Sequence, residues 1–392
     1  MDFDKVIERR QTGCVKWDSA ENIFGSSEVL PMWVADMDFE NAAPIKRALK
    51  DLIDNEVLGY TFPQDSLYSS IINWQKEKHG MAIEKEDILL SPGVLSSIAV
   101  AVQAFSEPGE SVLIHDPVYT PFCSMVEKNN RHVYRSPLKV VDGQYTMDFN
   151  DIENHFKSAN NIKLFILSNP HNPGGRVWSR EELIQLADLC KTHNIVLISD
   201  EIHSDLVYSD HKCLSPVTLD ESYRNIVVTL HSATKTFNIA GVKASFIIVF
   251  DPELRSKIVK AQEETELNAI NTFGMHATEA AFSKSAHWHS ELMIKLETNR
   301  SIVTDFFDKE LPDVSYMKPE STYLFWFDAS GLNVEASKLR ETFADLGKIG
   351  LNDGISYGPQ GKSYMRMNFA VPAPLLEDGL QRIKKVFKHC MN

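Results

Sequence analysis

Short apolar runs alternate along the chain with segments in which apolar residues recur every three or four positions. The apolar runs are DILLSPG, SVLIHDP, IKLFILSNP, IVLISDE, NIVVTLHS and ASFIIVF. Continuous apolar runs are typical of strands buried on both faces of a sheet, and the segments between them have the period of amphipathic helices. One of these helices begins at a capping box formed by Ser179 and Glu182. The pattern predicts an α/β fold with a mostly parallel central sheet flanked by helices.

The two ends of the chain have a different pattern. Residues 1–45 contain few helical signals. From about residue 286 onward, helical patterns precede strands such as STYLFWFD and SYMRMNFA, and the chain closes on LLEDGLQRIKKVFKHC. A chain of 392 residues is long enough for two domains. We therefore expect a large domain at 46–285 and a smaller α+β domain at 286–392, against which residues 1–45 pack.

The composition argues against several classes of partner. The net charge is −14, which disfavours binding to nucleic-acid phosphates and to anionic membranes. No apolar run reaches the roughly 18 residues that a membrane-spanning helix needs. The five cysteines include no C-x-x-C pair, and the start MDFDKVIERR lacks the apolar stretch of a secretory signal. We expect a cytoplasmic protein with reduced thiols that binds neither nucleic acid nor membrane, and no metal site.

Chemically unusual residues gather where the predicted strands end. Gly93 follows one strand, Asn169 to Asn172 follow another, Asp200 ends a third and Lys235 follows a fourth. In a parallel sheet, ligands bind at the carboxyl ends of the strands. We therefore expect these residues to meet at one site, although each taken alone has an ordinary structural explanation.

Three of the candidates carry charge. Lys235 lies on the turn HSATKTFNIAG; it is either a surface lysine or a desolvated nucleophile. Asp200, at the end of IVLI, has a carboxylate that needs a cationic partner or a proton if it is buried. A structural role as a helix cap or in a salt bridge would explain this residue equally well. Arg366 inside the apolar strand YMRMNF needs an anion, either a structural acid or a substrate carboxylate.

The remaining candidates are neutral. SPGVLSS predicts the end of a strand, a glycine turn and the start of a helix. The free N–H groups of such a helix start suit a phosphate, but the stretch is equally explained as an ordinary strand-to-helix turn. SNPHNPGG is either a surface loop or a rigid support for the amide of Asn172. Tyr119 in DPVYTPF is either a core residue or a stacking surface. A lysine nucleophile, an aspartate, an asparagine, a phosphate cup and an arginine together fit pyridoxal phosphate chemistry on an amino acid.

The order of these motifs resembles that of the class I/II aminotransferase family, pyridoxal phosphate fold type I. Within it, LPMWVADMDF, GYTFP, HNPGGRVWSREEL and SDEIHSDL are similar to the motifs of the MalY/PatB-type cystathionine β-lyases, or C–S lyases. The resemblance covers nearly the whole chain, and its motifs are specific in combination and weak singly.

The resemblance implies a role for each matching residue. For the cofactor, it assigns the Schiff base to Lys235, the pyridine nitrogen to Asp200, the 3-oxygen to Asn172, ring stacking to Tyr119, and the phosphate to the backbone of Gly93, Val94 and Leu95 and the Ser232 hydroxyl. For the substrate, it assigns the α-carboxylate to Arg366, with Asn172 beside it, and the entrance to Trp33 and Ala35. Tyr60 would reach the phosphate in the partner subunit, which implies a homodimer with shared sites. Lys235, Tyr60 and Tyr119 form the implied catalytic group.

The chain departs from the broader family pattern at two cofactor positions. Lys243 stands where many aminotransferases have a phosphate-binding arginine; it either supplies a point charge or faces elsewhere. His203 stands where a tyrosine is usual, so its contact with the ring oxygen is open.

The implied reaction is α,β-elimination of β-thio-substituted amino acids such as cystathionine and S-substituted cysteines, giving a thiol, pyruvate and ammonia. An aminotransferase shares nearly the same residues and differs in needing a keto-acid acceptor. A regulatory protein that keeps the cofactor without turnover is the third alternative. The stretch MWVADMDF favours the carbon–sulfur lyase.

Overall fold

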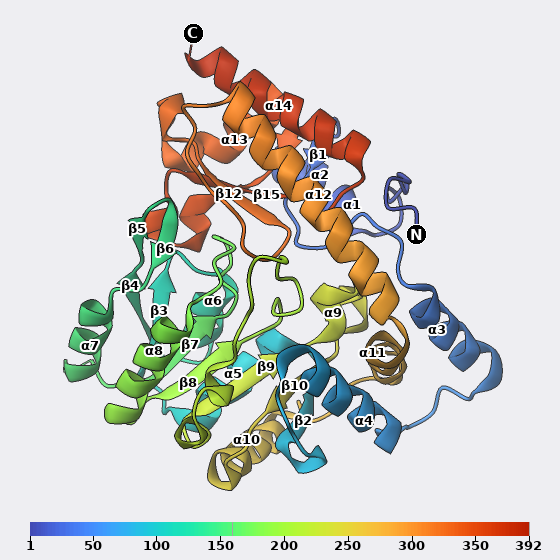
Figure 1. The fold of residues 1–392 in the computed structure, drawn as a ribbon, viewed down its shortest axis with the longest axis vertical. Coiled ribbons are helices and arrows are strands. Elements are labelled where there is room, and N and C mark those ends of the chain that lie inside the picture. The colour runs from blue at the N-terminus through green and yellow to red at the C-terminus, as the bar shows by residue number, and fades with distance from the viewer. Residues whose placement is uncertain (159, 392) are drawn as a thin grey trace.

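A seven-stranded sheet forms the centre of the computed structural model, which describes residues 1–158 and 160–391 (Figure 1). Its strands, in spatial order, are β2 (Ile88–Ser91), β10 (Ser245–Ile248), β9 (Val227–His231), β8 (Val196–Asp200), β7 (Ile162–Ser168), β3 (Ser111–Asp116) and β4 (His132–Pro137). All neighbours are parallel except β10, which runs antiparallel to both β2 and β9. The predicted α/β class with a mostly parallel sheet is confirmed.

Helices cover both faces of this sheet because its strands are apolar on both faces. Along β7, Leu164 and Ile166 belong to one apolar cluster, and Phe165 and Leu167 belong to the other. This alternation follows from the two-residue period of a strand. The first cluster includes α5 (Val94–Phe105), α6 (Pro121–Lys128) and α10 (Pro252–Thr265), and the second includes α4 (Asp65–Trp74), α8 (Arg180–Thr192) and α11 (Thr272–Lys284). The capping box of Ser179 and Glu182 at the start of α8 is present as predicted.

A second, antiparallel sheet lies toward the C-terminus. Its strands, in spatial order, are β11 (Tyr316–Met317), β12 (Leu324–Asp328), β15 (Tyr364–Asn368) and β14 (Asn352–Asp353). The helices of this region are α12 (Ala286–Glu310), α13 (Leu339–Gly347) and α14 (Ala373–Met391). Figure 1 shows α13 and α14 at the end of the molecule away from the central sheet, and α12 running from that end toward α11.

The N-terminal segment joins this C-terminal region. Its elements are α1 (Val15–Asp18), α2 (Ala20–Phe24) and β1 (Leu30–Pro31), and β1 pairs in parallel with β13 (Ile349–Gly350). The remaining elements are α3 (Ala43–Asn55), β5 (Lys139–Val141), β6 (Gln144–Thr146), α7 (Phe149–Lys157) and α9 (Ala233–Thr236). β1 and β13 thus join the two ends of the chain, and the division into domains with its boundaries stays a prediction.

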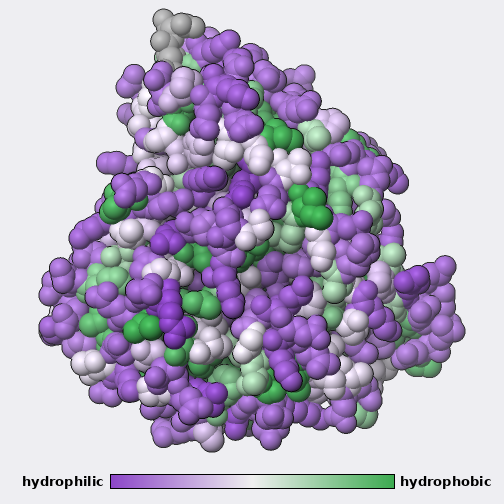
Figure 2. All heavy atoms as spheres, in the orientation of Figure 1, coloured by the Kyte–Doolittle hydropathy of each residue, from purple (hydrophilic) through white to green (hydrophobic). Residues whose placement is uncertain are grey.

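The surface view in Figure 2 is mostly hydrophilic, with small scattered apolar groups. Within the described part of the chain, none of the helices has the length and hydropathy required to span a bilayer.

Candidate active site

A cavity of about 300 Å³ opens at the edge of the central sheet where β7, β8 and β9 end. Of the predicted site residues, it is lined by Ala35, Gly93, Val94, Leu95, Tyr119, Asn172, Asp200, His203, Lys235 and Lys243. The convergence follows from topology, because the carboxyl ends of parallel strands lie at one edge of a sheet. Residues from six separate motifs therefore share one cavity.

Lys235 lies on α9, directly after β9. Ser232 caps this short helix by accepting a hydrogen bond from the Thr234 N–H, so the turn after the strand is fixed locally. The Lys235 amine donates to the Ala35 carbonyl at 2.6 Å. Burial, together with the nearby Arg366 charge, lowers the pKa of Lys235 to about 8. About a tenth of the amine is thus unprotonated and nucleophilic at pH 7, far more than for an ordinary lysine.

Asp200 ends β8 beneath the same cavity. Its carboxylate accepts a hydrogen bond from the Ile202 N–H at 3.2 Å, and no ion pair with a described residue holds it. Burial raises the pKa of Asp200 to about 7, and this backbone bond and the Lys235 charge only partly offset that effect. A buried carboxylate of this kind is stabilised by a cationic partner, such as a protonated ring nitrogen.

Arg366 is buried on β15 and has only neutral acceptors. Its guanidinium donates to Asn172 Oδ1 at 3.2 Å, to the Trp33 carbonyl at 2.8 Å and to Asn352 Oδ1 at 2.8 Å. Its Nε atom is buried without a hydrogen-bond partner, and among the described residues no carboxylate pairs with this charge. Since a buried charge without a counter-ion is costly, the site calls for an anion.

The start of α5 forms the other end of the cavity. Gly93 precedes this twelve-residue helix, and the first N–H groups of a helix have no partner within it. Lys243 also lines the cavity, and it has no ion pair among the residues that the structure describes. Free N–H groups and a point charge suit a phosphate, so the geometry favours the first of the two alternatives for Lys243.

Two further residues line the cavity between these ends. The Tyr119 ring packs edge-on against Phe122, and burial raises the pKa of its hydroxyl, so the phenol stays neutral. Burial, together with the Lys235 and Arg366 charges, lowers the pKa of His203 to about 3, and its Nδ1 has no hydrogen-bond partner. A neutral imidazole with a free nitrogen is available to a ligand.

Three of the predicted site residues, Ser232, Trp33 and Tyr60, do not line the cavity. The Ser232 hydroxyl is already engaged, because it donates to the Ala244 carbonyl at 2.7 Å. The Trp33 indole packs edge-on against Phe24, and it is the Trp33 backbone carbonyl that contacts Arg366. Tyr60 is fully exposed and lies outside the cavity of its own subunit. The roles of these three residues stay predictions.

Several residues around the cavity were not predicted from the sequence. Thr234 lines it, one residue before Lys235 in the same turn. Asn352 binds Arg366 from a neighbouring strand, and no local pattern singled it out. The Tyr323 hydroxyl donates to the Ala35 carbonyl at 3.0 Å. Tyr323 lies within the stretch STYLFWFD, directly before β12, where an aromatic residue is typical of a core position.

A buried polar cluster around Asp205 contacts the Lys235 turn through Thr236. Asp205 accepts hydrogen bonds from Thr236 at 2.8 Å and Trp74 at 2.9 Å, and it pairs with His79 at 2.8 Å. His79, Asp205 and His231 are close enough together for metal ligation. The donors on Asp205 already satisfy its carboxylate, so we interpret the cluster as structural.

Comparison with known sequences assigns the family. Residues 27–383 match the sequence profile of aminotransferase class I and II. The chain belongs to this family. It is 44% identical to cystathionine β-lyase PatB of Bacillus subtilis, over 98% of this chain and 99% of that protein.

Two solved structures are similar over almost the whole chain. One is a putative aminotransferase from Clostridium difficile with bound pyridoxal phosphate, with a TM-score of 0.95, 37% identity and coverage of 98% of this chain and 99% of that one. The other is the pyridoxal phosphate-bound C–S lyase of Staphylococcus hominis, with a TM-score of 0.92, 30% identity and coverage of 99% and 98%. The predicted family resemblance is confirmed.

Proposed function

We propose that this protein is a pyridoxal phosphate-dependent carbon–sulfur lyase that acts on β-thio-substituted amino acids, including cystathionine and S-substituted cysteines. One observation carries the proposal: Lys235 and Asp200 line one cavity, Arg366 donates to Asn172 in its lining, and none of the three charges has an ion pair among the described residues, in a chain 44% identical to a cystathionine β-lyase. The cofactor, the substrate carboxylate and the sulfur leaving group together account for this arrangement.

The cavity fits the cofactor residue by residue. The backbone at Gly93, Val94 and Leu95 and the Lys243 ammonium would hold the phosphate, and Asp200 would keep the ring nitrogen protonated. Tyr119 and Asn172 would contact the face of the ring and its 3-oxygen. When bound, the cofactor accepts the electron pair released at the substrate α-carbon.

The chain's own residues would position the substrate and move its proton. Arg366 would bind the α-carboxylate through paired hydrogen bonds. Lys235, whose amine is poised near neutral pH, would take the proton from the α-carbon, and the β-sulfur group would then leave as a thiol. Water converts the remaining fragment to pyruvate and ammonia. Elimination differs from transamination only in losing the β-group before the proton returns.

The reaction is tested by supplying S-methylcysteine, cystathionine or cystine to the purified protein with cofactor and no keto acid. We expect pyruvate to appear in equal amounts with the sulfur product, which is a thiol from S-methylcysteine or cystathionine and a persulfide from cystine, because elimination needs no amino-group acceptor. A transaminase would turn the substrate over only after a keto acid is added, and would give the β-thio-substituted keto acid, with its carbon–sulfur bond intact, instead of pyruvate. Tight cofactor binding with no turnover of any tested amino acid would favour a regulatory protein.

We further propose a homodimer with shared active sites. The segment after α3 exposes Val57, Leu58, Tyr60 and Phe62, of which Tyr60 is 112% exposed and Phe62 74% exposed. A run of large apolar side chains in water is costly and marks a contact surface. A second copy would cover it and bring Tyr60 to the partner's phosphate.

Homocysteine released from cystathionine is a methionine precursor, so we place the enzyme in cytoplasmic amino-acid metabolism.

The sharing of sites predicts complementation between two inactive variants. Tyr60→Ala and Lys235→Ala proteins, mixed under conditions that exchange subunits, should recover up to about a quarter of wild-type activity. Half of randomly exchanged two-fold dimers are hybrids, and each hybrid has one site without either lesion. Demonstrated exchange without recovery would mean that Tyr60 does not act across the interface. Each variant mixed with itself is the control.

A further inference from the structure

Residues 33–38, here called the strap, cross the mouth of the cavity beside Lys235. The strap presents the Ala35 carbonyl to the Lys235 amine at 2.6 Å, and the same oxygen accepts the Tyr323 hydroxyl at 3.0 Å. On its other side the strap borders a second, more open cavity of about 950 Å³, and Ala35 and Lys235 line both cavities. The position of the strap therefore decides where the amine points.

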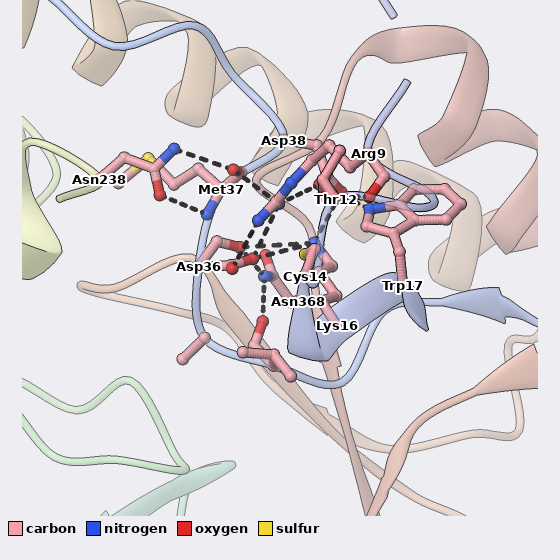
Figure 3. A network of polar contacts seen from close by, with 12 residues as sticks. Arg9, Thr12, Cys14, Lys16, Trp17, Asp36, Met37, Asp38, Asn238 and Asn368 are labelled. Carbon is pink, nitrogen blue, oxygen red and sulfur yellow. Dashed lines mark hydrogen bonds and ion pairs between the residues drawn. The ribbon is translucent and has the colours of Figure 1, made fainter. Parts of the chain in front are cut away.

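A network of charged groups from the N-terminal segment holds the strap (Figure 3). Arg9 grips both carboxylate oxygens of Asp36, at 2.8 and 3.1 Å, and also donates to the Met37 carbonyl at 3.2 Å. Arg9 bonds to Asp38 as well. Lys16 is fully buried and donates to Asp38 at 2.7 Å. The N-terminal segment thus fixes both the side chains and the backbone of the strap.

Two asparagines hold the strap from the catalytic side. Asn238, three residues after Lys235, accepts from the Met37 N–H and donates to the Met37 carbonyl, both at 2.9 Å. Asn368, two residues after Arg366, donates to the Val34 carbonyl at 2.6 Å and to the Asp36 carbonyl. The segments that carry Lys235 and Arg366 are therefore tied to the same strap that Arg9 and Lys16 hold (Figure 3).

The network is balanced in charge and lies within electrostatic reach of Lys235. It contains the cations Arg9 and Lys16 and the anions Asp36 and Asp38. Burial disfavours the charged forms of both Asp38 and Arg9. For Asp38, the Lys16 charge outweighs burial and keeps the pKa below its usual value. For Arg9, the bonds to Asp36 outweigh burial and keep the pKa above its usual value. The charges that act on Lys235 come from three elements: Arg366 on β15, Asp36 on the strap and Asp200 on β8.

We propose that Arg9 and Asp36 are positioning residues for Lys235: Arg9 holds the strap so that the Ala35 carbonyl orients the amine, and the Arg9–Asp36 pair sets the charge beside it. Neither residue lies in the cofactor cavity, so both act through the strap and through the field at the amine. The inference rests on the proposed function in one respect, because it uses the cofactor bound to Lys235 as its reporter.

The reporter is the pH midpoint of the visible absorbance of the holoenzyme, which follows the proton on the Lys235 nitrogen. Arg9→Met leaves the network with one net negative charge, because Lys16 alone then faces Asp36 and Asp38, and should raise this midpoint by about one pH unit. Asp36→Asn leaves one net positive charge and should lower the midpoint by a similar amount. The double variant restores charge balance and should return the midpoint toward the wild-type value. A role confined to folding would not produce shifts of opposite sign that cancel.

Arg255→Met is the matched control. Arg255 is 21% exposed against 22% for Arg9, and it likewise bonds an aspartate and a backbone carbonyl, but it pairs with Asp87 outside the cavity. Its midpoint should equal that of the wild type. If Arg9→Met does not fold, Arg9→Lys and Asp36→Asn decide: the lysine keeps the charge and should leave the midpoint close to the wild-type value, whereas Asp36→Asn should lower it.

Three results would overturn the inference. The inference would fall, and the proposed function would stand, if Arg9→Met and Asp36→Asn shifted the midpoint in the same direction. The same holds if the midpoints stay at the wild-type value in folded variants with a normal visible band. A wild-type chain that takes up cofactor without developing a visible band would overturn the proposed function, and the inference with it.

Discussion

Replacing Lys235 by alanine should abolish the covalent attachment of the cofactor and lower turnover by about a thousandfold or more. One substitution removes both the nucleophile that links to the cofactor and the group that moves the substrate proton. The amine is buried, has a pKa lowered to about 8 and donates to the Ala35 carbonyl, as suits a group in the proposed role. The measurements are the visible spectrum of the reconstituted protein and the rate of pyruvate release.

Lys243→Ala is the appropriate control because Lys243 is the other lysine that lines this cavity. It should weaken retention of the cofactor but leave the visible band and turnover largely intact at saturating cofactor. A Lys235→Ala protein that binds cofactor and releases pyruvate at the wild-type rate would refute the proposed mechanism.

The sequence is sufficient to predict the central sheet and the edge at which the site forms. Both depend on short-range information: apolar runs set the strands, and the residue that follows each strand is brought to the same edge by parallel topology. Lys235, Asp200 and Gly93 can therefore be grouped from the order of the strands alone.

Contacts between distant segments cannot be predicted in this way. Arg9 is one of several charges in a polar N-terminal stretch, and its position beside Asp36 depends on the packing of the whole N-terminal segment. The hydroxyl of Ser232 caps the short helix α9, and its predicted contact with the phosphate stays a prediction. Asn368, in contrast, can be predicted as a neighbour of Arg366, because the two-residue period of a strand places both on the same face.

The unpaired guanidinium of Arg366 allows a test in which two ligands differ only by a carboxylate. Alanine and ethylamine share the amine, and ethylamine lacks the carboxylate. Arg366→Lys keeps a charge but loses the planar fork, so it should weaken alanine binding by about a hundredfold, the size expected when one partner of a buried charged pair is lost. Ethylamine binding, followed through the cofactor absorbance, should change little, and kcat/KM for S-methylcysteine should fall with alanine affinity.

Arg131→Lys is the matched control for this change. Arg131 is also buried, at 8% exposed against 4% for Arg366, and its bonds likewise go to neutral acceptors, here at Ser106 and Asn129, away from the cavity. It should leave both ligand affinities unchanged, whatever it does to stability. If Arg366→Lys weakened alanine and ethylamine equally, or lowered only the melting temperature while the soluble enzyme kept its kinetics, Arg366 would be a structural residue. A selective loss of alanine binding follows only if its guanidinium is the partner of the substrate carboxylate.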